Sequence, residues 1–374
     1  MDSAIEMRRE HSVEDVLRFV RPAVRSQKPY VVGGVRDLPV KLNQNENPYD
    51  LPPALKRELV DAFMEIPFNR YPSEHPDRLR DALAQRLGRD PAGILVGNGS
   101  NELSYLLGLV LVERGTPVVL PRPMFSLYEK VIRLYGGALT EVAPLPDLRF
   151  DVAAIRDAVR STSPALTVIA SPNNPTGLAV PLADLESIVR EARGFVVVDE
   201  AYEEFNPEES AVTILDRYPN LIVMRTFSKA AGLAGLRVGY LVGWPEVIRE
   251  FGKARLPFNV DQLAETAALF LLERPELMAE RVRAVQESLR ELVAGLGQLK
   301  DVTVVPTQAN FVIFKTTLEP GVLMSRLAQA GVLVRDMSGY PDLKGYVRVS
   351  AGTPGENRAF LLALNQALHA SPGT

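Results

Sequence analysis

The chain has 374 residues, of which 46% are hydrophobic and 24% charged, an ordinary composition for a globular protein long enough for two domains. Its formal net charge of −4 offers no basic field for nucleic acid or anionic membranes, and the lack of cysteine excludes disulfides and thiolate chemistry. The three histidines (His11, His75 and His369) are far apart in the sequence, so we expect no metal site.

The N-terminal segment is charged throughout and lacks the apolar core of a signal peptide. The most apolar stretch, LSYLLGLVLV (103–112), is far shorter than the ~20 residues that a membrane span needs, and indicates a buried helix. We therefore expect a soluble, cytoplasmic protein with no membrane or nucleic-acid partner.

Short apolar runs alternate with helical stretches between residues 94 and 242: ILVGN, PVVLP, LTVIAS, FVVVDEAY, LIVMRTFS and RVGYLVG. Because these runs do not alternate with polar residues, they predict strands buried on both faces of a mostly parallel sheet in an α/β fold. Ligands bind at the carboxyl ends of such strands. Asn174, Asp199 and Lys229 each lie at or just beyond a strand end, so we expect them to converge.

The pattern changes after about residue 256. A helical stretch from Asp261 to about Leu299, broken at Pro275, precedes the apolar runs VTVVP, ANFVIFK, VLVRDM and YVRVSAG, which predict a smaller α+β unit. We predict an N-terminal arm (1–41) that packs on the small domain, a large domain (42–260) and a small C-terminal domain (261–374).

Lys229 lies in RTFSKAAGLAGLRVGY (225–240), between Ser228 and Arg237 and among small residues that let a ligand approach the backbone. A hydroxyl and a guanidinium beside a lysine suggest a phosphate held next to an amine that attacks a carbonyl. The alternative is a strand-end lysine with its head in water.

Asp199 ends the buried run FVVVD, where a carboxylate is costly unless it is paired. Its partner is either a nearby arginine or the pyridinium nitrogen of a cofactor. Tyr202, on the loop beyond, either packs as an aromatic or reaches the phenolate oxygen of that cofactor.

Two further segments favour a ligand site. SPNNPTG (171–177) holds two X-Pro bonds in a tight turn, which predicts a cis peptide that fixes Asn174. GNGSNE (97–102) links a strand to a helix, so the amides of Ser100 and Asn101 can point at an anion. Neither segment matches a nucleotide-binding motif.

In order and spacing, SPNNPTG, VVVDEAY and RTFSKAAGLAGLRVGY resemble the fold-type I pyridoxal-phosphate enzymes, the aspartate aminotransferase superfamily. Within it the chain is most similar to the histidinol-phosphate aminotransferases, through LNQNENPY, RYPS, GNGSNE, PMFSLYE, GVLVRD and VRVSAGTPGEN. The resemblance spans nearly the whole chain. It implies a large domain with a seven-stranded, mostly parallel sheet, a smaller α+β domain and pyridoxal 5′-phosphate as cofactor.

By this resemblance, Lys229 binds the cofactor covalently and moves the substrate's Cα proton, while Asp199 pairs with the pyridine nitrogen. Asn174 and Tyr202 bond the phenolate oxygen. Tyr71 comes from the neighbouring subunit, which implies a homodimer with shared sites. The remaining implied cofactor residues are Ser100, Asn101, Phe125, Thr226, Ser228 and Arg237. Many relatives have Asp at Asn101 and Tyr at Phe125, so a hydroxyl contact is lost here.

The resemblance also implies the substrates. Arg348 matches the arginine that binds the substrate carboxylate, Arg335 and Tyr30 match phosphate contacts of the histidinol-phosphate subgroup, and Asn47 belongs to the substrate-binding set. An arginine suits both phosphate and carboxylate, because its planar fork binds either anion at two points. We therefore expect amino transfer between an amino donor, histidinol phosphate, and a 2-oxo acid, 2-oxoglutarate, in histidine biosynthesis.

Other functions remain open. An aromatic or broad-specificity aminotransferase and a threonine-phosphate decarboxylase belong to the same superfamily. A regulatory protein that kept the fold without catalysis is disfavoured, because the lysine, aspartate and arginine set is intact. A nicotinamide-dependent dehydrogenase is disfavoured because its glycine fingerprint is missing.

Overall fold

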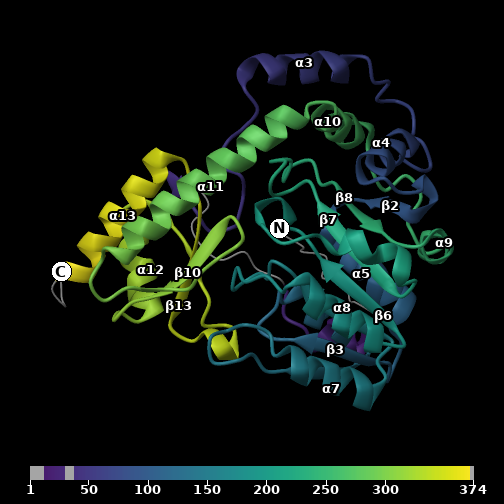
Figure 1. Cartoon of the computed structure of the whole chain (residues 1–374), viewed down its shortest axis with the longest axis horizontal. Helices are drawn as coiled ribbons and strands as arrows, with labels where there is room; N and C mark the ends of the chain where they lie inside the picture. Colours follow the sequence, from purple (N-terminus) through teal and green to yellow (C-terminus); the bar gives the residue numbers. More distant parts are fainter. Residues whose placement is uncertain (1–11, 30–37, 371–374) are drawn as a thin grey trace, which may run out of the picture.

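The computed structural model describes residues 12–29 and 38–370, and its larger domain is built on a seven-stranded sheet (Figure 1). All neighbouring strands are parallel except β8, which is antiparallel to both of its neighbours. The expected mostly parallel sheet is confirmed. In spatial order its strands are β2 (Ile94–Gly97), β8 (Gly239–Val242), β7 (Leu221–Thr226), β6 (Phe195–Asp199), β5 (Leu166–Ala170), β3 (Pro117–Pro121) and β4 (Ala138–Val142).

Helices cover both faces of this sheet, which is why its strands are apolar without alternation. One apolar cluster packs side chains such as Val119, Ile169 and Val198 against α4 (Asp77–Leu87), α7 (Val152–Thr162), α8 (Leu182–Glu191) and α10 (Gln262–Leu272). The other cluster packs Val118, Val197 and neighbours against α5 (Gly99–Leu111), α6 (Leu127–Tyr135) and α9 (Pro245–Gly252). The sequence missed β4, an edge strand in which Thr140 is half-exposed and Glu141 is exposed.

The smaller domain has a four-stranded antiparallel sheet with strand order β12–β13–β10–β9. Its core contains Phe311, Phe314 and Phe360, which are fully buried. Its elements are α11 (Pro275–Gly297), β9 (Thr303–Val304), β10 (Phe311–Lys315), α12 (Pro320–Gln329), β11 (Val332–Leu333), β12 (Arg335–Asp336), η4 (Pro341–Leu343), β13 (Tyr346–Ser350) and α13 (Pro354–His369).

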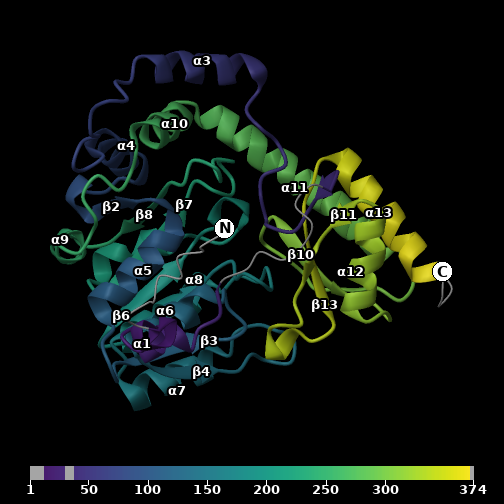
Figure 2. The same ribbon diagram turned by 180° about the vertical axis from the view of Figure 1, so that it is seen from behind.

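Helix α11 runs from the large domain to the small one, as Figures 1 and 2 show from opposite sides. The predicted break at Pro275 is confirmed, because α10 ends at Leu272 and Pro275 begins α11. The buried alanines of α10 pack in the large-domain core. The boundary predicted at residue 261 assigns α10 to the small domain. Helix α10 packs instead in the core of the large domain.

The N-terminal arm is described in part. We predicted that residues 1–41 pack on the small domain; β1 (Val40–Lys41) does pair with β11 there. By contrast, α2 (Pro22–Arg25), which follows α1 (Val13–Leu17), contacts α6 of the large domain. Helix α3 (Pro53–Met64) leads into the large domain and contacts α10.

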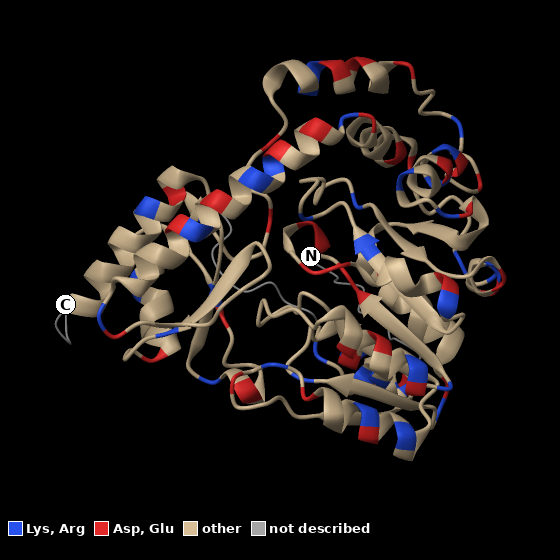
Figure 3. Ribbon diagram, viewed as in Figure 1, with Lys and Arg blue, Asp and Glu red and all other residues tan. Residues whose placement is uncertain are grey.

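Charged residues gather on the outer helices, whereas the strands of both sheets consist mainly of other residues (Figure 3). Among residues 12–29 and 38–370, no helix combines the length and the apolar content needed to cross a membrane.

Candidate active site

A cavity of about 700 Å³ lies between the two domains. Its floor consists of residues at the carboxyl ends of β5, β6 and β7 and in the loops that follow, including Asn174, Asp199 and Lys229. Its outer wall consists of small-domain residues on β12, on β13 and between them, including Arg335 and Arg348. The expected convergence of strand-end residues is confirmed, since all three floor residues line one cavity.

Lys229 follows β7, and its ammonium points into the cavity rather than to bulk solvent. Its Nζ donates to the carbonyl of Gln44 at 3.1 Å and lies 5.7 Å from the centre of the Tyr202 ring. Burial, and then the positive charges of Arg348 and Arg237, lower the pKa of the Lys229 ammonium to about 8, against the opposing charge of Glu46. About a tenth of the Lys229 side chains is therefore neutral at pH 7, the form that a nucleophilic amine requires.

Asp199 lies at the end of β6 and is only 8% exposed. Its carboxylate accepts hydrogen bonds from the Tyr128 hydroxyl at 2.7 Å and from the amide of Ala201 at 3.1 Å. The arginine partner that we considered is absent from these contacts. Burial raises the pKa of Asp199 above its usual value, against the Tyr128 hydrogen bond, which lowers it. A buried acid of this kind is suited to a protonated ring nitrogen.

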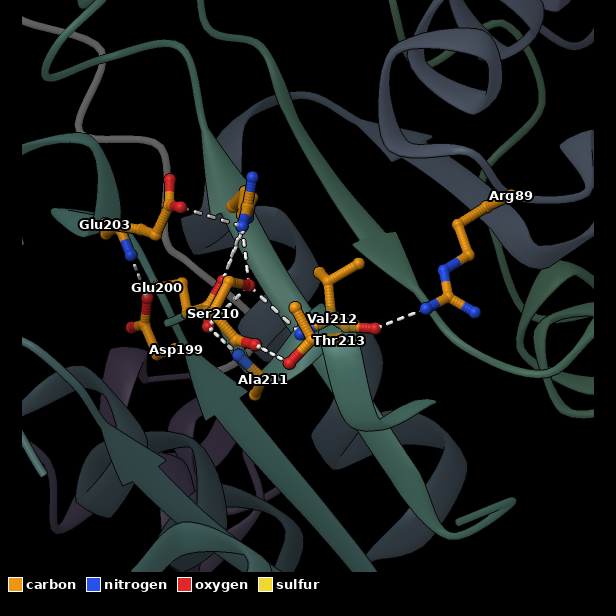
Figure 4. Close-up of polar contacts among 10 residues, drawn as sticks. Arg89, Asp199, Glu200, Glu203, Ser210, Ala211, Val212 and Thr213 are labelled. Carbon is orange, nitrogen blue, oxygen red and sulfur yellow. Dashed lines mark hydrogen bonds and ion pairs between the residues drawn. The ribbon is translucent and has the colours of Figure 1, made fainter. Parts of the chain in front are cut away.

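The residue after Asp199 belongs to a separate polar network (Figure 4). The carboxylate of Glu200 accepts from the Ser210 hydroxyl at 2.8 Å and from the amide of Ala211 at 2.7 Å, and pairs with Arg225 at 2.9 Å. Because Glu200 is 3% exposed and fully engaged, it fixes the turn that follows β6. This turn carries Asp199 and Tyr202 to the cavity.

Four groups form what we call the anion cradle: the amides of Ser100 and Asn101 at the start of α5, the Ser228 hydroxyl and the Arg237 guanidinium. Arg237 Nη1 donates to Ser228 Oγ at 3.2 Å.

Two glycines leave room for the groups of the anion cradle to lie close together. A Cβ atom on Gly99 (φ +79°) would collide with the Arg237 guanidinium, and one on Gly239 would lie 2.7 Å from the Ser100 nitrogen. Helix N-terminal amides with a guanidinium and a hydroxyl form a site for a phosphate.

Arg348 joins the small domain to the floor. Its Nη1 donates to Asn174 Oδ1 at 2.5 Å and its Nη2 to the Asn43 carbonyl at 2.9 Å. Both X-Pro bonds of SPNNPTG are cis, as predicted. Arg335 on β12 lies directly opposite Arg348 on β13 in the strand register. Both residues line the cavity, so two guanidinium groups reach the cavity from one sheet. Such a pair can bind a doubly charged anion.

Tyr202 is buried, and its hydroxyl accepts from Asn45 Nδ2 at 3.0 Å. Burial raises the pKa of this hydroxyl to about 12, so it stays a hydrogen-bond donor at neutral pH. Phe125 and Thr226 also line the cavity.

Two of the predicted residues do not line the cavity, and a third lies outside the described residues. Asn47 is not among the lining residues and donates to the Ala230 carbonyl at 2.9 Å, behind the lysine. Tyr71 is 80% exposed and does not line the cavity of its own chain. Tyr30 lies outside the described residues.

The sequence analysis missed contacts between distant segments. Tyr128 stands in the quoted motif PMFSLYE, but nothing in that motif says that its hydroxyl meets Asp199. The hydrogen bond from Lys229 to the Gln44 carbonyl is equally impossible to predict from the sequence motifs. Across the mouth, Arg122 pairs with Asp342 at 3.1 Å, joining the loop after β3 to η4. No local signal predicts such pairs.

The chain is similar to known proteins over most of its length. The sequence model of aminotransferase class I and II matches residues 39–364. A histidinol-phosphate aminotransferase of Chlorobaculum tepidum is 39% identical over 93% of this chain and 100% of the relative.

Two solved structures are similar over most of the chain. A histidinol-phosphate aminotransferase from Sinorhizobium meliloti, in complex with pyridoxal-5′-phosphate, superposes with TM-score 0.83 at 25% identity, covering 94% of this chain and 97% of that one. An L-threonine-O-3-phosphate decarboxylase from Porphyromonas gingivalis superposes with TM-score 0.79 at 26% identity, covering 88% and 100%.

Proposed function

The chain belongs to the aminotransferase class I and II family, and we propose that it moves an amino group between L-histidinol phosphate and 2-oxoglutarate in histidine biosynthesis, with pyridoxal 5′-phosphate as cofactor. One observation carries the proposal: a lysine and a buried aspartate lie at adjacent strand ends beside the anion cradle. The 39% identity to a histidinol-phosphate aminotransferase supports the substrate.

The residues of the floor fit this cofactor. The anion cradle would hold its phosphate, and the space for Arg237 depends on Gly99, where a Cβ would collide with the guanidinium. Asp199 would hold the ring nitrogen protonated, because a buried carboxylate is stabilised by such a partner. Asn174 and Tyr202 would bind the phenolate oxygen, and Phe125 would lie on the ring.

Pyridoxal 5′-phosphate, when bound, supplies a carbonyl that captures amines and a ring that accepts the electron pair released at the substrate's Cα. Lys229 Nζ would hold the cofactor in the resting enzyme. As a free amine, the same nitrogen would take the proton from the donor's Cα. Its pKa of about 8 suits both tasks, since the free amine forms near neutral pH.

The outer wall is suited to two substrates in turn. Histidinol phosphate has a phosphate and no α-carboxylate, whereas glutamate has two carboxylates. Arg348 can bind either anion, and Arg335 adds a second guanidinium that favours the doubly charged phosphate. We propose that Asn47 and Tyr30 also contact the substrate.

We also infer a cytoplasmic homodimer in which Tyr71 completes the anion cradle of the second subunit. Tyr71 is 80% exposed and does not line the cavity of its own chain, which supports a role outside that cavity. Met64 and Phe68, each 76% exposed, lie just before it in the sequence and offer apolar surface for a second copy.

One alternative is decarboxylation of threonine phosphate, because a structure named for that activity superposes with TM-score 0.79 at 26% identity. An aromatic or broad-specificity aminotransferase is a further alternative. These activities differ in product, so one assay separates them.

The experiment supplies the holoenzyme and 2-oxoglutarate with histidinol phosphate, histidinol, phenylalanine, tyrosine or threonine phosphate, and measures glutamate and CO₂. Histidinol phosphate should exceed histidinol by about 10² or more in kcat/KM, because charge-assisted bonds to the phosphate are lost. Faster reaction of phenylalanine or tyrosine would favour the aromatic alternative. Release of CO₂ from threonine phosphate would favour the decarboxylase.

A further inference from the structure

A continuous chain of hydrogen bonds joins the first turn of α5 to the loop that carries Tyr71. Asn259 stands at its centre: its Nδ2 donates to Glu102 Oε1 at 2.5 Å, and its Oδ1 accepts from Arg255 Nη1 at 2.5 Å. Arg255 continues the chain, because its Nη2 donates to the Glu74 carbonyl at 2.5 Å and lies 2.6 Å from His75 Nδ1. The two ends of the chain have different surroundings.

One end lies next to the anion cradle of the same subunit. Glu102 follows Ser100 and Asn101 in the first turn of α5. Asn98, just before that helix, donates from Nδ2 to the Asn259 carbonyl at 3.2 Å. Asn259 is therefore bonded to the start of α5 through both its backbone and its side chain.

The other end presents an exposed aromatic ring. Tyr71 stacks on Phe258, with ring centres 4.8 Å apart and planes inclined by 21°. Phe258 has a φ of +56°, a left-handed conformation that a bulky residue adopts only when its surroundings hold it there. The bonds of Asn259, the next residue, supply that restraint. The stack is thereby fixed in direction although Tyr71 is 80% exposed.

We propose that Asn259 is a positioning residue that acts across the dimer: it holds Phe258, and through it Tyr71, in place for the anion cradle of the second subunit. The inference rests on the proposed homodimer with shared sites. In each subunit these hydrogen bonds run from the residue beside its own anion cradle to the loop of Tyr71, and Tyr71 would serve the other subunit, so the two cofactor sites are linked.

Hybrid dimers test the direction of this action. The first subunit is wild type at Lys229 and holds the one site that can bind the cofactor covalently; the second carries Lys229→Ala. Different affinity tags on the two chains allow the hybrid to be purified. The readout is the rate at which lysine-bound cofactor leaves the first subunit, followed by absorbance and by capture on an apo-acceptor enzyme, with melting temperature and dimer mass alongside.

Asn259→Ala in the second subunit should accelerate release from the first by about tenfold, as one lost phosphate contact predicts, and Tyr71→Ala there should do the same. Asn259→Ala in the first subunit should have a smaller effect, because that site still receives an intact Tyr71. Asn365→Ala in the second subunit, an exposed position on α13, is the control and should leave release unchanged.

The outcomes separate this inference from the dimer itself. If Tyr71→Ala accelerates release across the interface but Asn259→Ala acts only within its own subunit, the positioning role is overturned and the shared site survives. If Tyr71→Ala has no effect across the interface, or the protein is a monomer, the shared site itself fails. Should Asn259→Ala prevent assembly, Phe258→Leu keeps an apolar side chain, removes the stack and must give the same faster release in the second subunit.

Discussion

The floor of the cavity, where Asp199 and Lys229 lie, is formed at the ends of neighbouring strands of one buried sheet, whereas the outer wall is formed by β12, β13 and the segment between them in a second domain. The floor is fixed by the large-domain core. The small domain is attached through polar contacts, such as Arg348 with Asn174, and through apolar packing, since Tyr202 and Phe205 belong to the small-domain core cluster. This difference suggests a division of labour in which the floor performs the amino-transfer chemistry and the wall selects the donor.

The largest effect should come from Lys229→Ala, because under the proposed function it would remove both the covalent attachment of the cofactor and the group that moves the Cα proton. We expect kcat to fall by about 10³-fold or more for every donor. Activity is measured with glutamate and with histidinol phosphate, and equal losses are expected because the floor serves both. A loss confined to one donor would contradict the division between floor and wall.

Asp199→Asn should lower kcat by about 10²-fold or more with both donors, since an amide cannot hold the ring nitrogen protonated as a carboxylate does. Burial raises the pKa of Asp199, so its ionised form destabilises the apoenzyme once the pH exceeds that pKa. The variant should therefore melt at the same or a higher temperature at pH 7. Lower stability with unchanged activity per folded molecule would indicate a structural carboxylate instead.

Substitutions in the wall should distinguish the donors. Arg348→Ala should impair glutamate and histidinol phosphate alike, because its guanidinium receives either anion. Arg335→Ala should impair histidinol phosphate by about 10-fold to 10²-fold and glutamate by less, since charge-assisted bonds to the phosphate are lost. Comparing kcat/KM for both donors tests this, and equal losses in Arg335→Ala would remove the reason for assigning it to the phosphate.

The pH dependence of cofactor capture should report on the floor alone. With a pKa of about 8, the neutral fraction of Lys229 increases about tenfold between pH 7 and pH 9, so capture by the apoenzyme should accelerate over this range. Below pH 8 the ammonium dominates and capture slows. For the same reason the contribution of Lys229 to the free energy of unfolding increases with pH from about 8 to 10.5, where the unfolded state still binds the proton.

Stopped-flow absorbance and apoenzyme melts measure these two effects. A capture rate that stays flat up to pH 10 would show that the Lys229 amine has an ordinary pKa.

The smallest effect should come from breaking the Arg122–Asp342 ion pair at the mouth of the cavity. Among the ion pairs of residues 12–29 and 38–370, Arg122–Asp342 is the one that joins the loops of the small sheet to the large domain. Because Arg122 is partly exposed, Arg122→Gln or Asp342→Asn should change the KM of the amino donor by less than tenfold and leave kcat nearly unchanged. A double-mutant cycle measures the coupling, and a large fall in kcat would mean that the pair acts on the chemistry.

The same division explains what the sequence could predict. Apolar runs mark buried strands, so the positions of Asp199 and Lys229 at strand ends followed from local pattern. The antiparallel β8, the edge strand β4 and the contact of α2 with α6 did not, because partner and direction depend on packing across the domain. The site contacts of Tyr128 and Gln44 link segments 71 and 185 residues apart, which no motif encodes.

The most direct test of the account is to reduce the holoenzyme with borohydride, digest it and locate the cofactor by peptide mass spectrometry. The cofactor should be attached to the peptide that contains Lys229, and exposure of the holoenzyme to histidinol phosphate before reduction should abolish that attachment. Attachment to a different lysine, or the absence of any attached cofactor, would contradict the claim that the floor of this cavity performs amino transfer.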